Sequence, residues 1–355
     1  MSRPAVVFGG PSDEHDISIL TGLQAVHALK DVEAFYWTKA GEWFQIDNDA
    51  EAADFVDGRP RRSKSIQLIA GPGQGFVAKR PVAINSVVNC CHGGPGEDGT
   101  LQGILDLAGL RYTGPGQAAS ALCMDKLAFG AAMTAAGLPT LPRVLVSPDV
   151  TPPFIGPMIA KPRFGGSSIG IEVVEDWETA LALVSASPFF ATGGVAEPFL
   201  AESRDLQMAV RTWPATEFSA IEEPVRSGGG IYSYSQKYLA WGGEVSGGRE
   251  LPAKVDEATT DTLRQLAASV TVAAGLRGIC RIDFLQRDGD LFVNEVNTIP
   301  GSMAAYLWIE PKLSRVELFQ GMIDEALNRP PRRFSIAGAD GSALRNAGTI
   351  QSKLG

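Results

Sequence analysis

Two short segments late in the chain carry side chains that could hold a divalent cation. Arg281 and Asp283 alternate in the first segment, and Glu295 and Asn297 alternate in the second. Asp288-Gly289 between them is a strong β-hairpin signal, and the strand period of two directs each pair to one face. Facing carboxylates in a sheet interior need a cation, and Asp, Glu and Asn oxygens suit Mg²⁺ that bridges substrate phosphates. The alternative is an exposed strand face that carries charges.

The register of this hairpin decides whether the two carboxylates meet. A strict two-residue loop at positions 288 and 289 would set Asp283 opposite Asn294. For Asp283 to lie opposite Glu295, the pairing must shift by one residue. We therefore predict a loop of odd length, such as 288–290, or a bulge.

A lysine followed by a glycine-rich loop forms a second candidate site. The segment from Lys161 to Gly170 reads Lys-Pro-Arg-Phe-Gly-Gly-Ser-Ser-Ile-Gly. Glycines let backbone N–H groups approach an anion closely and serines add hydroxyl donors, which suits a loop that covers a polyphosphate. The lysine precedes the glycines, so the segment is neither a Walker A loop nor a GxGxxG loop. A plain hairpin loop is the alternative.

Two further loops combine acids, a histidine and glycines. Residues 92–103 (HGGPGEDGTLQG) follow a predicted strand and favour a binding loop, although Asp98 or Thr100 would also suit a helix N-cap. Residues 12–18 (SDEHDIS) lie at the first turn of the opening helix, where acids also stabilise the helix dipole. For each loop, ligand binding and a role at a helix N-terminus are both compatible with the sequence.

Hydrophobic periodicity places these loops on an α/β framework. Residues 5–8 predict a strand that ends at Gly9-Gly10, and apolar residues from Ile17 to Leu29 recur at helical spacing. We expect further strands at 36–37, 43–46, 87–91, 144–146, 158–160 and 195–196, and helices at 118–136, 177–184, 258–274 and 316–327. Residues from Gly338 onward show little periodicity and are predicted to form a tail.

The overall composition is that of a folded globular protein. The 355 residues are 45% hydrophobic and 20% charged, which excludes an intrinsically disordered chain. The net charge of −9 argues against nucleic acid as a partner. No apolar stretch approaches the ~18 residues of a membrane helix and no signal peptide is recognisable, so we expect a cytoplasmic protein without a membrane partner. The four cysteines form no CxxC pair, which argues against a zinc site or a disulfide framework.

Taken in order, these motifs resemble those of the D-alanine–D-alanine ligases of the ATP-grasp superfamily. The resemblance covers about residues 4–327. It rests on the segments described above, on CMDK at 123–126 and on NEVNTIPG at 294–301, which stand at the family's relative positions. The resemblance implies an ATP-dependent carboxylate–amine ligase that joins two amino acids through an acyl phosphate and releases ADP and phosphate.

The resemblance also implies the domain organisation. The implied fold is of the α/β (α+β) class, an ATP-grasp fold with an N-terminal Rossmann-like domain that precedes it. We expect an N-terminal substrate domain at 1–117, the small ATP-grasp subdomain at 118–200, the C-terminal catalytic subdomain at 201–330 and a tail at 331–355. Relatives commonly form dimers, so a homodimer is implied as well.

The resemblance gives each candidate residue a role. The implied ATP-binding residues are Lys126, Lys161, Ser167, Ser168, Glu197, Asp205 and Lys237. Within that set, Glu197 would lie near the adenine and Asp205 on the ribose, where the family usually has Glu. The implied ligands of two Mg²⁺ ions are Asp283, Glu295 and Asn297. Arg281 and the backbone N–H of Gly301 would stabilise the charge of a tetrahedral intermediate.

The donor half of the implied amino-acid pocket matches the family, and the acceptor half does not. Glu14 would recognise the first ammonium group in a link with Ser167 and Tyr238, and His92 would lie near the first carboxylate. After the NTxPG motif the family typically carries a serine that binds the second carboxylate, and Tyr306 occupies that position here. We hypothesise that the ligase mechanism persists while the acceptor differs from D-alanine.

Three other functions stay open. A ligase of specialised metabolism, which couples an amino acid to a mycosporine core or makes an unusual dipeptide, would share these motifs. The retained Arg281 and the three metal-ligand candidates speak against a nucleotide-binding regulatory protein without turnover. A dinucleotide oxidoreductase, suggested by the opening strand and Gly9-Gly10, would need a GxGxxG loop and a later acid on the ribose, and the chain lacks both.

Overall fold

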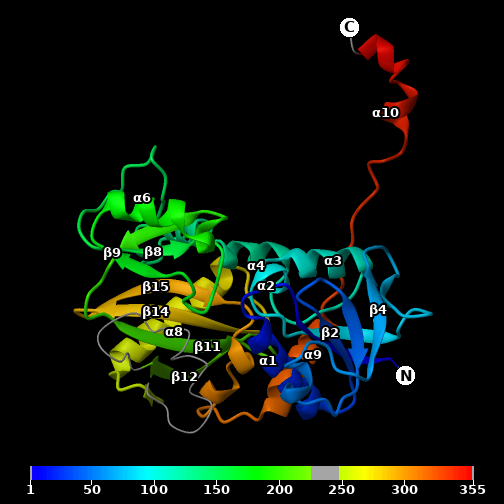
Figure 1. Ribbon diagram of the computed structural model, residues 1–355, viewed down its shortest axis with the longest axis horizontal. Coiled ribbons are helices and arrows are strands. Elements are labelled where there is room, and N and C mark those ends of the chain that lie inside the picture. Colours follow the sequence, from blue (N-terminus) through cyan, green and yellow to red (C-terminus); the bar gives the residue numbers. More distant parts are fainter. Residues whose placement is uncertain (1, 225–247, 354–355) are drawn as a thin grey trace.

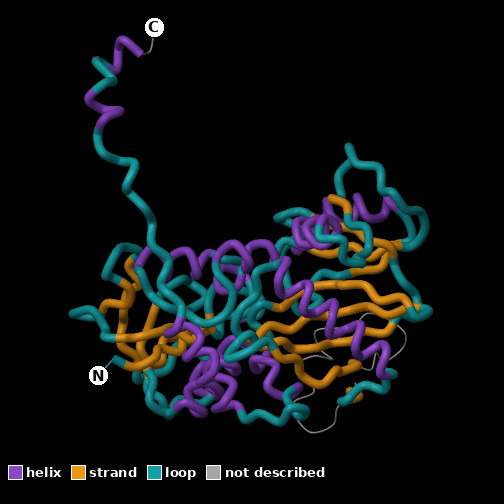
Figure 2. Tube along the Cα trace, turned by 180° about the vertical axis from the view of Figure 1, so that it is seen from behind, coloured by secondary structure: helices purple, strands orange, loops and turns teal. Residues whose placement is uncertain are grey.

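Three β-sheets with surrounding helices make up the fold. The computed structural model of the chain describes residues 2–224 and 248–353. In this part of the chain the sheets contain six, four and five strands. The second sheet lies above the third, and the first sheet lies to one side of both (Figure 1). Figure 2 shows the same arrangement from behind.

The first sheet has a parallel centre and an antiparallel flank. Its strand order is β5-β4-β3-β2-β1-β6, and β1 runs parallel to β2 and to β6. The strands are β1 (Arg3–Gly9), β2 (Glu33–Trp37), β3 (Trp43–Ile46), β4 (Ser63–Ile69), β5 (Gly75–Val77) and β6 (Ile84–Asn89). The helical segments are α1 (His15–Leu29), η1 (Ala52–Phe55), α2 (Gly94–Glu97) and α3 (Thr100–Ala108). The predicted strand, glycine turn and opening helix are confirmed.

Close packing between α1 and β1 fixes the first turn of the opening helix. Residues 5–8 form a continuous apolar run, which suits a strand that is buried on both faces. α1 approaches this strand at Gly22, where an added Cβ would lie 2.3 Å from the Phe8 ring. The contact holds Glu14, the N-cap residue of α1, at the carboxyl end of β1.

The second sheet is small and antiparallel. Its strands are β7 (Val144–Leu145), β8 (Met158–Pro162), β9 (Glu172–Val174) and β10 (Gly194–Pro198), in the order β7-β10-β8-β9. Two helical segments join it, α6 (Trp177–Ala186) and η2 (Pro188–Phe190). α6 begins at Asp176, whose carboxylate accepts a hydrogen bond from the N–H of Thr179 at 2.8 Å. The sheet sets Lys161 on β8 beside Glu197 on β10.

The single helix predicted over 118–136 is wrong. Two helices, α4 (Gln117–Met124) and α5 (Lys126–Ala135), are separated at Asp125. The Asp125 carboxylate caps α5, because it accepts hydrogen bonds from the N–H groups of Leu127 and Ala128 at 3.1 and 3.2 Å. It also pairs with Arg163 at 2.6 Å. One acid in an alanine-rich run changes the periodicity little, so the sequence pattern conceals the break.

The third sheet is antiparallel and has one apolar and one polar face. Its strands are β11 (Arg204–Arg211), β12 (Glu217–Pro224), β13 (Arg249–Glu250), β14 (Ile279–Arg287) and β15 (Asp290–Asn297), in the order β13-β12-β11-β14-β15. Leu206, Ile282 and Phe284 belong to one core with Leu263 of α8 (Glu257–Ala273). Strand alternation therefore directs the residues between them, including Asp283, to the opposite face.

The last elements of the chain return to the first sheet. η5 (Gly301–Leu307) follows β15, and α9 (Arg315–Asn328) comes after it. Leu318 and Phe319 of α9 share one hydrophobic core with Val6 and Phe8 of β1. The chain then leaves the body in a segment with two short helical turns, α10 (Ser342–Arg345) and η6 (Ile350–Lys353) (Figure 1). None of the helices in the described ranges has the length and apolar character that a membrane crossing requires.

We expect Phe319→Ala to lower the free energy of unfolding by about 3–5 kcal/mol, because it leaves a cavity in the core that α9 shares with β1. Phe319 is 1% exposed, whereas Val316 on the same helix is 50% exposed. The matched control Val316→Ala should therefore change stability by less than about 0.5 kcal/mol. Urea denaturation of the three proteins provides the measurement. Equal losses in both variants would show that α9 does not complete the core.

Candidate active site

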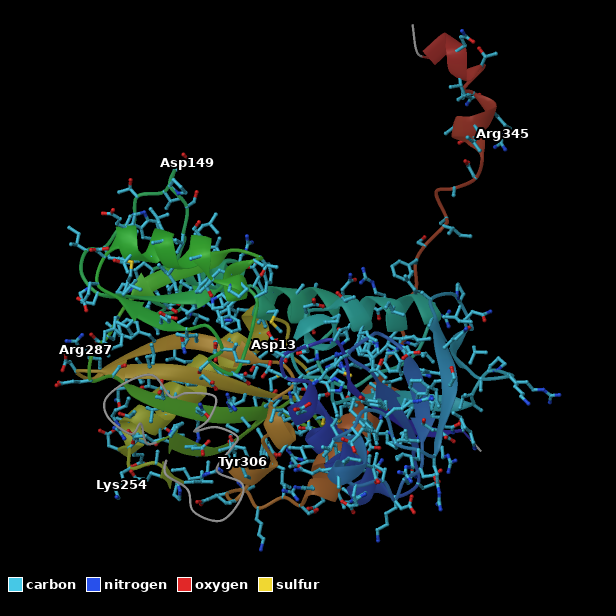
Figure 3. All side chains as sticks on the ribbon, in the orientation of Figure 1. Asp13, Asp149, Lys254, Arg287, Tyr306 and Arg345 are labelled. Atoms are coloured by element: carbon cyan, nitrogen blue, oxygen red, sulfur yellow. The ribbon has the colours of Figure 1, made fainter. Side chains whose placement is uncertain are left out.

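Candidate residues from the second and third sheets line one cavity. The cavity has a volume of about 100 Å³, and its walls include Lys161, Ser168, Glu197, Asp205, Asp283 and Glu295. Lys161 Nζ lies 3.4 Å from Asn294 Oδ1, so β8 and β15 approach each other at this point. Figure 3 shows the side chains that fill the space between the two sheets. Residues that the sequence offered in separate motifs are thus brought together.

The two carboxylates of the late hairpin lie opposite each other, as predicted. The turn contains only residues 288 and 289, whose φ angles of 53° and 91° suit a tight hairpin. The register then shifts by one, so that Asp283 pairs with Glu295 instead of Asn294. Asn294 is left as the additional residue of a β-bulge. The bulge is confirmed as the device that aligns the carboxylates.

This pair belongs to a row of polar residues that crosses four strands. Glu222 on β12 pairs with Gln207 on β11, and Gln207 pairs with Asp283 on β14, which pairs with Glu295 on β15. Paired residues on neighbouring strands point to the same face, so the row lies on the side of the sheet away from α8. Sequence reasoning missed Gln207 and Glu222, because a strand pattern does not reveal which strand is its neighbour.

The donor set around Asp283 fits a cation that is bound by oxygen atoms. Arg281 donates two hydrogen bonds to Asp283, at 2.7 and 2.8 Å, and Asn297 donates a longer one at 3.3 Å. Within residues 2–224 and 248–353, no three His, Cys, Asp or Glu side chains form a metal-binding group. Two carboxylates and one amide would hold a cation together with substrate oxygens or water, which is the usual way in which Mg²⁺ binds phosphates.

Glu197 organises the positive charges of the second sheet. Its side chain is buried and forms ion pairs with Arg143, at 3.2 Å, and with Lys161. Burial alone would raise the pKa of Glu197, but the charges of Arg143 and Lys161 outweigh it and lower that pKa to about 2. Arg143 also donates hydrogen bonds to the carbonyl groups of Lys126 and Asn294. Sequence reasoning missed Arg143, because it stands alone before a short strand and outside every motif.

Lys126 is a buried cation at the start of α5. Its ammonium group donates a hydrogen bond to the carbonyl oxygen of Gly165 in the glycine-rich loop. Burial lowers the pKa of Lys126, and the nearby charge of Lys161 lowers it further, whereas Glu295 raises it. The lysine therefore lies within electrostatic reach of both the loop and the carboxylate row.

Glu14 is enclosed by two of the candidate loops. Ser167 donates a hydrogen bond to Glu14, and Glu14 makes no side-chain capping bond to α1. An added Cβ at Gly93 or at Gly166 would lie 2.6 Å from Glu14 Oε2, so a larger residue at either position would displace this carboxylate. This carboxylate therefore binds Ser167 and does not cap α1 through a side-chain hydrogen bond.

A second buried acid, Glu97, lies beside Glu14. Glu97 accepts hydrogen bonds from the N–H groups of Gly93 and Ile299, both at 2.9 Å, and from the hydroxyl of Thr298 at 3.1 Å. Burial, together with the charge of Glu14, raises the pKa of Glu97 to about 7. Sequence reasoning did not single out Glu97 from its loop. Its position in the sequence gave no signal, because two of its three hydrogen-bond partners, Thr298 and Ile299, come from the far end of the chain.

His92 is a neutral, buried residue of the same region. Its Nε2 atom lies 2.8 Å from the hydroxyl oxygen of Thr21, and that oxygen also accepts a hydrogen bond from the N–H of Ser302. Burial lowers the pKa of His92 to about 4. The imidazole therefore carries no charge near pH 7, and it links α1 to the start of η5 through Thr21.

Tyr306 lies at the other end of the polar row. Figure 3 places it between the third sheet and the helices of the first. Its phenol donates a hydrogen bond to Glu222, and Arg249 lies 3.6 Å from Glu222 and 5.0 Å from the centre of the Tyr306 ring. Burial raises the pKa of Tyr306 and that of Glu222. Glu222 thus fixes the phenol from one side and Arg249 covers its ring.

Of the remaining predicted residues, the structure places two, and two others lie outside the described residues. Asp205 lies on β11 opposite Leu285 and lines the cavity between the sheets. Gly301 is the first residue of η5. Tyr238 and Lys237 lie outside the described residues. The arrangement as a whole offers lysines on one side and carboxylates on the other, with the buried carboxylate of Glu14 nearby, which suits phosphoryl transfer to a small acid.

Both halves of the chain match one family. The family described as "D-ala D-ala ligase N-terminus" matches residues 3–115, and "D-ala D-ala ligase C-terminus" matches residues 146–324. This chain is 33% identical to the D-alanine–D-alanine ligase of Mycobacterium sp. (strain KMS), over 365 residues. It is also 33% identical to that of Mycobacterium tuberculosis (strain CDC 1551 / Oshkosh), over 363 residues. These matches cover 92% of this chain and 97% and 96% of the relatives.

Solved structures of similar proteins share the fold. The VanG D-Ala:D-Ser ligase from Enterococcus faecalis has a TM-score of 0.78 at 24% identity, and the match covers 92% of this chain and 99% of that chain. The D-alanine-D-alanine ligase from Coxiella burnetii has a TM-score of 0.77 at 22% identity and covers 99% of both chains.

We expect Glu97→Gln to flatten the pH dependence of stability between about pH 4.5 and 7. An acid whose pKa is raised by folding holds its proton more tightly in the folded state, so its contribution is present below pH 4.5 and is lost as the pH rises through about 7. The wild-type protein should lose on the order of 1–3 kcal/mol across this range relative to the variant. Urea denaturation at several pH values measures this, and parallel curves for the two proteins would contradict it.

Proposed function

Because the chain belongs to the D-alanine–D-alanine ligase family, we propose that it joins two amino acids after activating the carboxylate of the first with ATP. It is an ATP-dependent ligase that forms carbon–nitrogen bonds, and it has the ATP-grasp fold. The first carboxylate attacks the γ-phosphate to give an acyl phosphate and ADP. The second amine then displaces phosphate through a tetrahedral intermediate and loses a proton. Both steps build up negative charge, so positioning and cations are the main requirements.

The observation that carries the proposal is the bulge that sets Asp283 opposite Glu295. It puts two carboxylates on the polar face of the third sheet, where they line one cavity with Lys161 of the second sheet. A structural protein gains nothing from this arrangement, since facing carboxylates repel each other. A site for a metal nucleotide requires it.

ATP would bind in the cavity between the second and third sheets. Lys126 and Lys161 would contact its phosphates, and the loop that carries Ser167 and Ser168 would cover them. The ribose would lie at Asp205, and Lys237 would complete the phosphate contacts. The adenine would lie along β10 near Glu197, whose carboxylate keeps Lys161 in position.

Two Mg²⁺ ions would be held by Asp283, Glu295 and Asn297, whose oxygen atoms are ligands that Mg²⁺ prefers. Bound Mg²⁺ supplies charge that neutralises the phosphoryl oxygens during transfer. Arg281 would exchange part of its contact with Asp283 for the developing oxyanion, together with the N–H of Gly301.

The first amino acid would bind with its ammonium group at Glu14. The hydrogen bond from Ser167 orients this carboxylate, and the two glycines let their loops approach it closely. Tyr238 would join Glu14 and Ser167, and His92 would lie near the first carboxylate. Being neutral, His92 would act as a hydrogen-bonding group and not as a charge.

The second amino acid would meet Tyr306, whose ring and bond to Glu222 support an acceptor other than D-alanine. The same observation favours a second candidate function, a ligase of specialised metabolism that makes an unusual dipeptide or couples an amino acid to a mycosporine core. Product identification by mass spectrometry, with ATP and a panel of D- and L-amino acids, separates the two functions. Absence of any turnover would instead favour a regulatory nucleotide-binding protein.

Three further properties remain proposals. The domain limits after residues 117, 200 and 330 are supported by the three sheets, whose strands run from 3 to 89, from 144 to 198 and from 204 to 297. A homodimer is proposed from the family resemblance, and a cytoplasmic location is proposed from the apolar pattern of the sequence.

We expect Asp283→Asn to reduce ATP-dependent phosphate release by roughly 10²-fold or more, because the change removes one of the two opposed carboxylates. Asp290→Asn, on the exposed end of the same hairpin, is the matched control and should keep full activity. Phosphate release at saturating Mg²⁺ and ATP measures both variants, and thermal unfolding checks their folds. Similar activity in the two variants would refute the assignment of Asp283.

With D-alanine as the only amino acid, we expect phosphate release at least about 10-fold slower than with the best acceptor of the panel. Tyr306→Ser should raise the rate with D-alanine, because it removes the ring. Tyr306→Phe keeps the ring and should not raise it. A wild-type protein that already turns over D-alanine fastest would remove the basis for an altered acceptor.

A further inference from the structure

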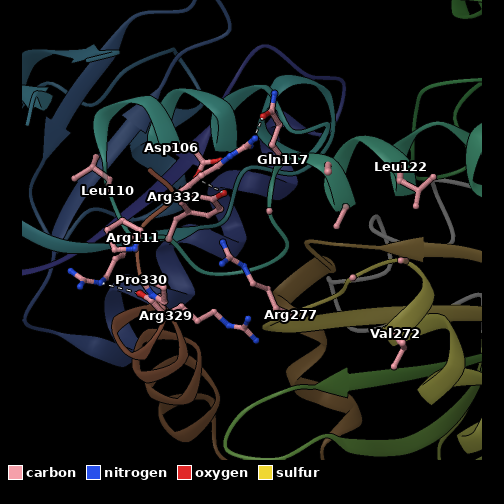
Figure 4. Close-up of a pocket in the computed structure, with 18 of the residues that line it drawn as sticks. Asp106, Leu110, Arg111, Gln117, Leu122, Val272, Arg277, Arg329, Pro330 and Arg332 are labelled. Carbon is pink, nitrogen blue, oxygen red and sulfur yellow. Dashed lines mark hydrogen bonds and ion pairs between the residues drawn. The ribbon is translucent and has the colours of Figure 1, made fainter. Parts of the chain in front are cut away.

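A second cavity lies apart from the candidate active site. Its volume is about 580 Å³, and it is lined by the junction of α3 and α4, the end of α8 with the segment up to 277, and the end of α9 with the first residues beyond it. None of the residues assigned to substrate, ATP or metal lines it. Figure 4 shows the cavity, surrounded by arginine side chains from each of these segments.

Four arginines line this cavity, and two of them have acidic partners. Arg329 pairs with Glu325 at 2.8 Å, and Arg332 lies 3.5 Å from Asp106. The other two are Arg111 and Arg277, and neither has an acidic partner among the described residues. They leave an excess of two positive charges at the cavity wall.

The two unpaired guanidinium groups are held in place by one nitrogen each. Arg111 Nε donates to the carbonyl oxygen of Arg329 at 3.3 Å, and Arg277 Nε donates to that of Gly114. Arg277 also stacks 4.7 Å from the centre of the Tyr112 ring. The hydroxyl of Tyr112 is fixed in turn by Asp106, at 3.0 Å. Both arginines therefore keep their terminal N–H groups for a ligand, with little loss of side-chain freedom on binding.

A helix N-terminus and apolar side chains form other parts of the cavity wall. α4 begins here at Gly116, which provides no side-chain cap for the N–H groups of the first turn, and these groups favour negative charge. Leu110 lies beside Arg111 at one side of the cavity, and Leu122 and Val272 provide an apolar wall at the other side, beyond Arg277 (Figure 4). Figure 4 shows these three side chains around the same space as the arginines. Charge and apolar surface are thus both present.

We propose that this cavity binds a small organic phosphate monoester. A phosphate monoester carries close to two negative charges near pH 7, which matches the excess of two arginines, and its oxygens suit the fork of a guanidinium group. The volume exceeds what inorganic phosphate needs and lies in the usual range for small-molecule sites. The apolar wall would contact the organic part of the ligand. The site is independent of the ligase reaction and uses none of its residues.

Calorimetric titration of the full chain with phenyl phosphate tests this site. Saturating Mg²⁺ and a non-hydrolysable ATP analogue are present throughout, so that the nucleotide and γ-phosphate positions of the proposed active site are filled and do not contribute. We expect one molecule bound per chain, and weaker binding of inorganic phosphate, which leaves the apolar wall empty. Equal affinities for the two probes would also support the site but would assign it to free phosphate. Absence of saturable binding for both probes would overturn the proposal.

Three variants identify the groups that bind. Arg111→Gln and Arg277→Gln should each weaken binding of phenyl phosphate about 10-fold or more, since each removes charge-assisted hydrogen bonds. Arg62→Gln, whose side chain is 84% exposed on the first sheet, is the matched control and should bind as the wild type does. Thermal unfolding shows whether the variants fold. If Arg277→Gln does not fold, Arg111→Gln alone decides the test. Unchanged affinity in both cavity variants would overturn the proposal, whatever the ligase activity of the chain.

Discussion

Two carboxylates that face each other in a sheet repel, and the candidate active site is arranged to offset that repulsion. Asp283 and Glu295 cannot turn to the other face of the third sheet, because Ile282 and Phe284 fill it against α8. Because the bulge aligns the two acids on one face, cations must lie nearby to offset their repulsion. Arg281 pairs with one carboxylate, and the charge of Lys126 interacts with the other. A metal nucleotide, as proposed, would add further positive charge beside these carboxylates.

The second sheet holds its share of this charge in a fixed geometry. Glu197 binds Arg143 and Lys161 at once, and Arg143 reaches the backbone of both α5 and β15. One buried ion-pair cluster thus ties together the elements that carry the lysines and the carboxylates. Because these dipoles and charges are already oriented, little reorganisation is needed when charge develops on a substrate.

Sequence reasoning succeeded where the chemistry lies in short contiguous motifs. The hairpin with its shifted register followed from local residue order and from the condition that two carboxylates meet. Arg143 was not understood, because its role depends on Glu197 and Asn294, which are distant in the chain, and the cap at Asp125 was missed because it leaves the apolar periodicity unchanged. Tyr306 was found from its place in a motif, but not its contact with Glu222. The pattern of α9 likewise showed an apolar face without showing that this face completes the first sheet's core.

The position of α9 governs when the protein can finish folding during its synthesis. The strands of the first sheet all precede residue 90, yet their core includes side chains of α9, which ends at Asn328. At roughly 5–20 residues per second, a ribosome needs on the order of 10–50 s to make the intervening chain. Throughout that time the apolar surface of β1 and α1 lacks the cover that α9 provides, so the first sheet cannot complete its core before α9 has been made.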